Sequence, residues 1–203
     1  MAMRSLVLLI VAVVLAGCGS GPPQPIYGDA FKNIYNQSAS SVPVDKPATV
    51  QQPVGIILSD NVEAYFGFIQ KSNEYWSKIV PASLTNNVAI ADSDPHYISE
   101  RVLTLIKRRY PTAALIHDFK EAVGTGKKGV FLVDIKPVLG GSSFKTTTVD
   151  ISLYVFDAKM NPVSTVSGHG EGVIPYPGTD GRVQVSTDAA IQQLDAKMSA
   201  LIH

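Results

Sequence analysis

An early segment of the chain carries apolar residues at helical spacing. Residues 54–58 form a short apolar run that predicts a buried strand. Asp60 then suits the N-cap of a helix that begins at Asn61. The apolar positions of this helix lie three or four residues apart: Val62, Tyr65, Phe66 and Ile69. Because Gly67 weakens a helix, a strand over 65–69 is an alternative.

A second amphipathic segment predicts the clearest helix in the chain. Asp94 suits its N-cap, Pro95 fits the first helical position, and Pro111 ends the element. The apolar face of this helix comprises Ile98, Val102, Leu105 and Ile106. We also expect a short strand at 88–90, ahead of the helix.

The second half of the chain changes to a strand pattern. Apolar runs predict strands at 113–116 and 130–135. Residues 149–156 alternate between two sets of side chains, so this strand should have one face in the core and one wetter face. The segment 157–162 predicts a hairpin loop, and the chain returns as a partner strand over 163–173.

The chain closes with an amphipathic helix. Ser186 or Thr187 fits its N-cap, and its apolar face comprises Ile191, Leu194, Met198 and Leu201. We therefore expect an α+β fold, in which an antiparallel or mixed sheet has helices packed on one face and ends in this C-terminal amphipathic helix.

Composition divides the chain into a tether and a single domain. Residues 18–52 are rich in proline, glycine and serine, which is typical of a flexible tether, and residues 53–203 are long enough to form one folded domain. Within the tether, residues 26–27 and 31–35 form an apolar island. This island is either a docking segment for a partner or a short helix that lies back on the domain, and we favour the second.

The extreme N-terminus has the pattern of a secretion signal. Arg4 precedes an apolar run at 6–15, which is shorter than the ~20 residues that span a bilayer. The sequence Leu15-Ala16-Gly17-Cys18 follows, and it resembles the lipobox of bacterial lipoproteins. The resemblance implies that residues 1–17 are a signal peptide and that Cys18 is acylated. An ordinary secretion signal or a short membrane anchor is the alternative.

The residue after this cysteine bears on location. In Gram-negative lipoproteins, Asp directly after the cysteine commonly retains the protein at the inner membrane, and here that residue is Gly19. The resemblance therefore implies an outer-membrane lipoprotein that faces the periplasm. Membrane lipid is then one partner, through the acylated N-terminus.

Composition excludes several classes of function. The 17 basic and 17 acidic residues balance, so no basic field indicates nucleic-acid binding. Cys18 is the only cysteine. Once it is acylated, the chain has no thiol for a disulfide, a zinc site or nucleophilic catalysis.

The segment 130–202 resembles a group of periplasmic lipoprotein domains. It combines a central strand, a long alternating strand, a Phe-Asp-Ala-Lys turn and an alanine-bearing amphipathic helix. This pattern is similar to the TolB N-terminal domain and to the curli-secretion and transport-auxiliary lipoproteins. Members of that group commonly scaffold or assist envelope complexes. The resemblance implies a protein partner in the cell envelope and supplies no catalytic residue.

Possible catalytic groupings are incomplete. The Gly-rich stretch 124–129 lacks the spacing of a phosphate-binding loop and is better explained as a cationic hairpin loop. No complete metal or hydrolase pattern is formed by Asp92, Asp94 and His96, by His117 with Asp118, or by His169. We therefore expect no enzyme activity, no metal and no cofactor.

Two surfaces are candidates for partner binding. Gly168 and Gly170 indicate a bulge or a close backbone approach in an edge strand, and such an edge can accept another chain. Tyr75 and Trp76 belong to an aromatic cluster with Tyr65, Phe66 and Phe68, and core packing is the default interpretation of this cluster. The sequence thus predicts a lipid-anchored, non-catalytic scaffold or accessory subunit of an envelope complex. A small-ligand or lipid carrier is the alternative, and a periplasmic hydrolase is a less favoured one.

Overall fold

The structure is a computed structural model of the chain. It describes residues 22–29, 52–79, 94–139, 146–172 and 181–200. The expected strand at 88–90, the apolar segment 31–35 and Cys18 lie outside these ranges.

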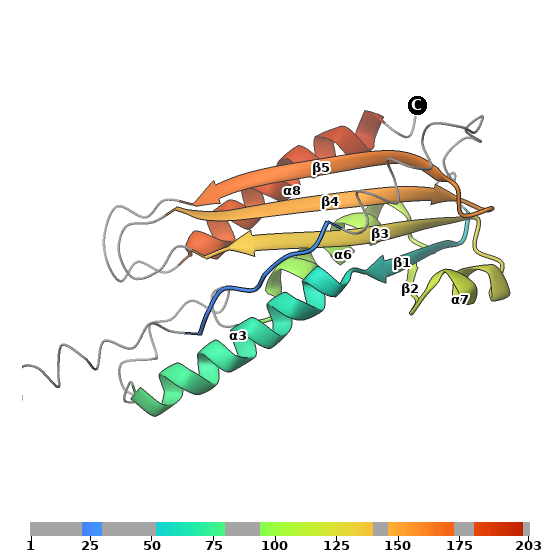
Figure 1. Cartoon of the computed structure of the whole chain (residues 1–203). Coiled ribbons are helices and arrows are strands. Elements are labelled where there is room, and N and C mark those ends of the chain that lie inside the picture. The colour runs from blue at the N-terminus through green and yellow to red at the C-terminus, as the bar shows by residue number, and fades with distance from the viewer. Residues whose placement is uncertain (1–21, 30–51, 80–93, 140–145, 173–180, 201–203) are drawn as a thin grey trace, which may run out of the picture.

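A five-stranded mixed sheet forms the centre of the domain (Figure 1). The strands are β1 (Val54–Leu58), β2 (Ala114–Leu115), β3 (Gly129–Val138), β4 (Thr147–Asp157) and β5 (Pro162–Gly172). Their order is β2-β1-β3-β4-β5. β1 runs parallel to β2 and β3, and β3 to β5 form an antiparallel meander. The α+β class and the mixed sheet are confirmed.

Three helices cover one face of this sheet: α3 (Asp60–Ile79), α6 (Tyr97–Arg109) and α8 (Arg182–Ala200). The alternation along β4 gives that face its apolar side chains. Val149, Ile151, Leu153 and Val155 are 0 to 3% exposed and join the core of the three helices. The helix α3 is continuous through Gly67, so the alternative of a strand over 65–69 is wrong.

The boundaries of α6 and α8 differ from the sequence prediction. α6 begins at Tyr97 instead of Pro95, because the Asp94 carboxylate accepts a hydrogen bond from the backbone N–H of His96, at 2.9 Å, and so closes a turn ahead of the helix. α8 begins at Arg182. Ser186 is not its N-cap: the hydroxyl lies one turn inside the helix and donates to the Arg182 carbonyl at 2.8 Å.

A short helix, α7 (Phe119–Gly124), was not predicted. Its N-terminus is a variant of the capping box, in which the return bond comes from the residue before the N-cap Asp118. The Asp118 carboxylate accepts from the backbone N–H of Glu121, and the Glu121 carboxylate accepts from the backbone N–H of His117, both at 2.7 Å. α7 packs a second apolar cluster on the face of the sheet opposite the three long helices. The stretch 124–129 therefore joins a helix to a strand and is not a hairpin loop.

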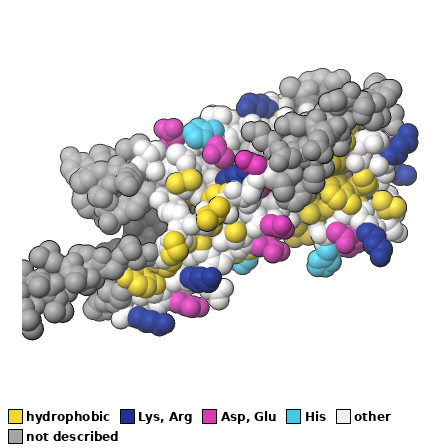
Figure 2. Space-filling view, in the orientation of Figure 1, with side chains coloured by type: hydrophobic (Ala, Val, Ile, Leu, Met, Phe, Trp, Pro, Cys, Tyr) yellow, Lys and Arg dark blue, Asp and Glu magenta, His cyan; other side chains and the backbone are white. Residues whose placement is uncertain are grey.

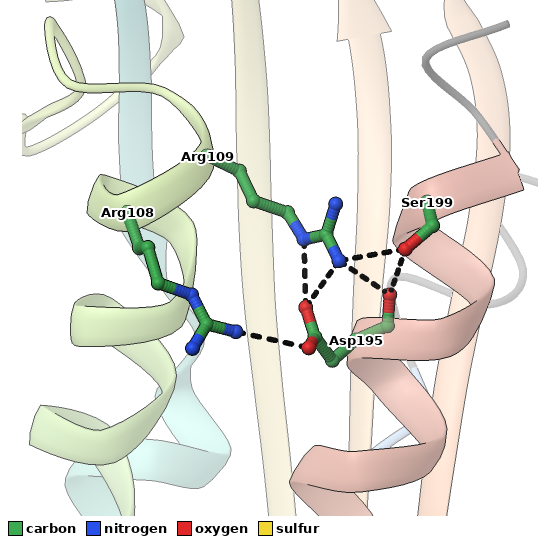
Figure 3. Close-up of polar contacts among 4 residues, drawn as sticks. All are labelled: Arg108, Arg109, Asp195 and Ser199. Atoms are coloured by element: carbon green, nitrogen blue, oxygen red, sulfur yellow. Dashed lines mark hydrogen bonds and ion pairs between the residues drawn. The ribbon is translucent and has the colours of Figure 1, made fainter.

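Ion pairs fix α8 beside α6 (Figure 3). The Arg109 guanidinium donates to the Asp195 carboxylate from Nε at 2.7 Å and to the Ser199 hydroxyl at 2.7 Å. Arg108 donates to the other oxygen of Asp195 at 2.9 Å. Burial opposes the charge of Asp195, but these guanidinium groups outweigh that effect and lower the pKa of the carboxyl. This network sets the position of α8 over the outer strands of the sheet.

Among the described residues, no helix combines the length and the apolar character that crossing a membrane requires.

Candidate functional site

The side of β3, β4 and β5 that faces away from the three long helices carries polar side chains and a hollow of about 500 Å³. Its floor includes Asp134, Asp150, Ser152, Thr165 and Ser167. The strand register brings these side chains together, because Asp134 pairs with Ser152, and Ser152 pairs with Ser167. Figure 2 looks onto this face and shows acidic, basic and histidine side chains gathered over the strands. We call it the open face.

Residues 22–29 run along β3 as an extended segment at the edge of the open face, and we call this segment the strap (Figure 1). The Gln24 amide donates to the carbonyl of Leu139 at 2.8 Å and accepts from its N–H at 3.3 Å. The Tyr27 hydroxyl donates to the Pro137 carbonyl at 2.7 Å, and its ring packs against the core. This part of the predicted flexible tether is therefore held on the domain.

A buried polar network fixes the other end of the strap. The Asn61 amide accepts from the backbone N–H of Gly28 at 2.9 Å and donates to the Gly28 carbonyl at 3.0 Å. It also donates to Asp134 at 2.8 Å, and the same carboxylate oxygen accepts from the Ser59 hydroxyl at 2.6 Å. All three side-chain partners are at most 6% exposed. Asp134 thereby joins the sheet, the start of α3 and the strap.

Lys136 adds a charge contact between the strap and the sheet. Its ammonium lies 2.5 Å from the Asp29 carboxylate and 3.6 Å from the second oxygen of Asp134. Partial burial disfavours the ammonium, but the hydrogen bond to Asp29 and the two carboxylate charges outweigh it. The pKa of Lys136 is therefore raised, and the ion pair is retained at neutral pH.

His169 lies between two acids at the exposed side of the open face. Its Nδ1 is 2.7 Å from Asp150, and its Nε2 is 3.2 Å from Glu171. These hydrogen bonds, with that of Asp150 the largest contribution, raise the pKa of the imidazole. A hydrolytic base needs one ring nitrogen directed at the nucleophile. Both nitrogens of His169 contact carboxylates, so this histidine is arranged as a cation and not as a base.

The pKa of His169 should fall when Asp150 is replaced by Asn, because the largest source of its upward shift is removed. An NMR titration of the imidazole Cε1–H signals measures this. The raised pKa of His169 also determines how the stability of the domain depends on pH. The two ion pairs contribute fully below about pH 6.5, the pKa of unperturbed histidine, and their contribution is lost as the pH rises through the raised pKa. An unchanged titration in Asp150→Asn would contradict the contact.

The glycines that the sequence assigned to partner binding face α8. A Cβ atom at Gly168 would lie 2.0 Å from the Ala190 carbonyl oxygen, and one at Gly170 would lie 1.8 Å from that of Ser186. The expected close backbone approach in an edge strand is confirmed, and the approaching backbone belongs to the protein itself. Because both glycines are buried, a partner would have to contact other atoms of β5.

Side chains of α8 also occupy part of the outer edge of β5. Gln193 accepts from the backbone N–H of His169 at 3.2 Å, and the Lys197 ammonium donates to the Ser167 carbonyl at 2.6 Å. Covering of this kind protects an edge strand from unwanted pairing. Addition of a partner strand here would have to displace both side chains, and it stays a prediction.

The predicted aromatic cluster divides between core and surface along α3. Tyr65 is 1% exposed, and Phe66 and Phe68 pack against the core. Trp76 is 44% exposed, and its ring meets that of Tyr75 edge-on with centroids 5.3 Å apart. Core packing therefore explains the first part of the cluster, whereas Trp76 remains available to a partner.

The other sequence candidates do not converge. His96 packs edge-on against Phe66 at the start of α6, while His117 belongs to the capping box of α7. In the described ranges, no group of three or more His, Cys, Asp or Glu side chains is placed to hold a metal ion. Sequence reasoning missed Asn61 and Asp134, and the available signal was an acidic residue inside the apolar run 130–135.

Comparison with known proteins gives structural similarity only. No family model matches the chain, and no curated protein matches it. Among solved structures, a PelC dodecamer from Paraburkholderia phytofirmans is 11% identical, with 79% of this chain and 93% of that one covered and a TM-score of 0.39. A point variant of the same protein is 12% identical, with coverages of 80% and 96% and the same TM-score. A Xanthomonas campestris protein described under the family model DUF330 is 8% identical, with coverages of 79% and 95% and a TM-score of 0.34. Similarities of this size say nothing about function.

Proposed function

We propose that the chain is a lipid-anchored protein of the bacterial envelope, in which the α+β domain serves as a non-catalytic scaffold or accessory subunit. The N-terminus supports this proposal, because a charged residue, an apolar run and small residues precede the only cysteine. Gly19 favours the outer membrane, with the domain in the periplasm. The partner is a protein of an envelope assembly or transport complex.

The observation that carries the non-catalytic role is the open face. It presents carboxylates, hydroxyls and the His169 pair around a solvent-open hollow, and it joins the strap to the sheet. Mixed polar surfaces of this kind are typical of non-obligate protein interfaces, which are polar and hydrated. A hydrolase is less well supported, because both nitrogens of His169 contact acids. An apolar carrier would need a pocket between sheet and helices, and the hollow lies on the opposite face with charged walls.

The anchor is tested by replacing Cys18 with Ser. Wild-type protein should sediment with membranes and incorporate labelled fatty acid, because two or more acyl chains hold a protein on a bilayer essentially permanently. The Cys18→Ser protein should be soluble and should unfold at the same urea concentration as the wild-type domain. A Cys18→Ser protein that is cleaved elsewhere and still stays on the membrane, without label, would contradict the lipid anchor.

The partner surface is tested by photocrosslinking in cells. A photoreactive amino acid at Ser167, which is exposed on the open face, should capture one recurrent envelope protein that mass spectrometry can identify. Thr104, exposed on α6 at the other side of the domain, is the matched control position and should not capture it. Equal capture from both positions, or none from Ser167, would count against the open face as the partner surface.

A further inference from the structure

The strap changes the effective length of the tether. It is fixed to the domain from Gln24 to Asp29, and the described segment begins at Pro22. Three residues separate Cys18 from Pro22, and five separate it from Gln24, the first residue of the strap that contacts the domain. The six residue steps from Cys18 to Gln24 span at most about 22 Å. An acyl group on Cys18 would therefore hold the domain close to the bilayer surface, whereas a flexible coil over 18–52 would allow about 30–35 Å.

The strap also fixes which end of the domain faces the anchor. It runs along β3 from Asp29, beside Lys136, back to Gln24, beside Leu139. α3 starts next to Asp134, through Asn61, and extends in the same direction (Figure 1). A 20-residue helix is about 30 Å long, while the five residues from Asp134 to Leu139 extend about 17 Å. The last turns of α3 therefore project beyond β3 at the end where the strap begins.

This projecting end has the chemistry of a membrane–water interface. Trp76, which is 44% exposed, lies on the projecting half of α3 with the exposed cations Lys71 and Lys78. At the same end, Val138 of β3 is 50% exposed, and Ile26 of the strap is 97% exposed. Tryptophan is enriched at the headgroup level of bilayers, and lysine covers apolar surface while its ammonium reaches the headgroups. Glu74 is also exposed on this half of the helix, between the two lysines.

We infer that the strap docks the domain directly on the lipid surface that holds Cys18, with the Trp76 end of α3 in contact with the headgroups. This inference rests on the proposed lipid anchor. The occupant of the surface is the bilayer leaflet, because the short connection between Cys18 and Gln24 leaves this end facing the headgroups. The open face then has a fixed orientation to the membrane, whereas a long flexible tether would let it move and turn freely.

Trp76 itself is the probe for this inference, because it is the only tryptophan in the chain. The full-length acylated protein, purified from membranes in detergent, is reconstituted into vesicles of phosphatidylethanolamine and phosphatidylglycerol. Its fluorescence is compared with and without brominated acyl chains. We expect a shift of the emission to shorter wavelength and quenching by the brominated lipid.

Two variants make this test specific. Gln24→Ala combined with Tyr27→Phe removes three of the hydrogen bonds of the strap, and it should reduce the quenching while the protein stays acylated and vesicle-bound. Moving the tryptophan, as Trp76→Phe with Thr104→Trp, should abolish the quenching. Circular dichroism of both variants confirms that the domain is folded.

The outcomes separate the two proposals. A protein that is acylated and vesicle-bound, but whose Trp76 emits as in water and is not quenched, overturns the docked orientation and leaves the lipid anchor intact. A shift without quenching by brominated lipid shows that a second copy covers Trp76, and it also overturns the inference. A protein that carries no acyl group and does not bind vesicles contradicts both proposals.

Discussion

Gly170→Ala should destabilise the domain by about 2–3 kcal/mol. The added Cβ atom would lie 1.8 Å from the Ser186 carbonyl oxygen and 2.8 Å from the Ala190 backbone nitrogen. Both atoms belong to the helix backbone, so no side-chain rotation relieves the clash. α8 would have to move away from β5, against the ion pairs that Arg109 makes with Asp195. Overpacking of a tight interface costs about 1–3 kcal/mol, occasionally more.

The measurement is the free energy of unfolding in urea, and Gly67→Ala is the matched control. Gly67 lies inside α3, and a Cβ atom there meets nothing within 4 Å. The same chemical change should stabilise the domain by roughly 0.5–1 kcal/mol, because alanine favours the helix. The two alanine variants are thus expected to have opposite signs. If Gly170→Ala were as stable as the wild type, α8 could not lie at the observed distance from β5.

The β-rich half of the fold could be predicted from local pattern. The alternation at 149–156 gives the strand β4, and its apolar set proves to be the face covered by helices. The glycines around His169 also gave the right local conclusion, namely a close backbone approach. The approaching backbone was not predictable, because Ser186 and Ala190 lie about 20 residues further along the chain and approach only when α8 packs on β5.

The predicted helix starts were wrong where the same residue type also fits another local structure. Asp94 and Pro95 fit a helix start, yet the same aspartate also suits a turn, and the turn formed. Serine and threonine suit N-caps, but Ser186 and Thr187 are fully buried inside α8. Local propensity does not distinguish a cap from an interior position such as Ser186, whose hydroxyl bonds to the preceding turn.

The strap shows why the prediction of a flexible tether, which was made from composition, is wrong for residues 22–29. Proline and glycine predict a segment without helix or strand, and residues 22–29 indeed form neither. Their order comes from long-range contacts, such as that of Gln24 with the backbone of Leu139, which is 115 residues away. The pairing of Asn61 with Asp134 spans 73 residues. Contacts at such separations leave no local pattern, so this part of the candidate site could not be predicted.

Asp134→Ala should cost about 3 kcal/mol, because it removes the only charge from a buried network and leaves two donors without an acceptor. The carboxylate is 4% exposed, and one of its oxygens accepts from both Ser59 and Asn61. Breaking a buried charged group away from its partners typically costs about 3–5 kcal/mol. Because water can solvate the Lys136 ammonium after the change, we expect a loss of stability at the lower end of this range. Urea unfolding measures it.

Asp150→Ala is the matched control, since it removes a carboxylate from the neighbouring strand on the same face. Asp150 is 54% exposed and forms an ion pair with the exposed His169, so its loss should cost less than about 1 kcal/mol. The two variants should also differ in the strap. Asn61 holds both Gly28 and Asp134, so Asp134→Ala should speed hydrogen exchange at the Gly28 amide, while Asp150→Ala should leave it unchanged. Equal exchange in both variants would show that the strap is held independently of the buried network. The orientation of the domain on its anchor would then depend on the other contacts of the strap, which are those of Gln24, Tyr27 and Asp29.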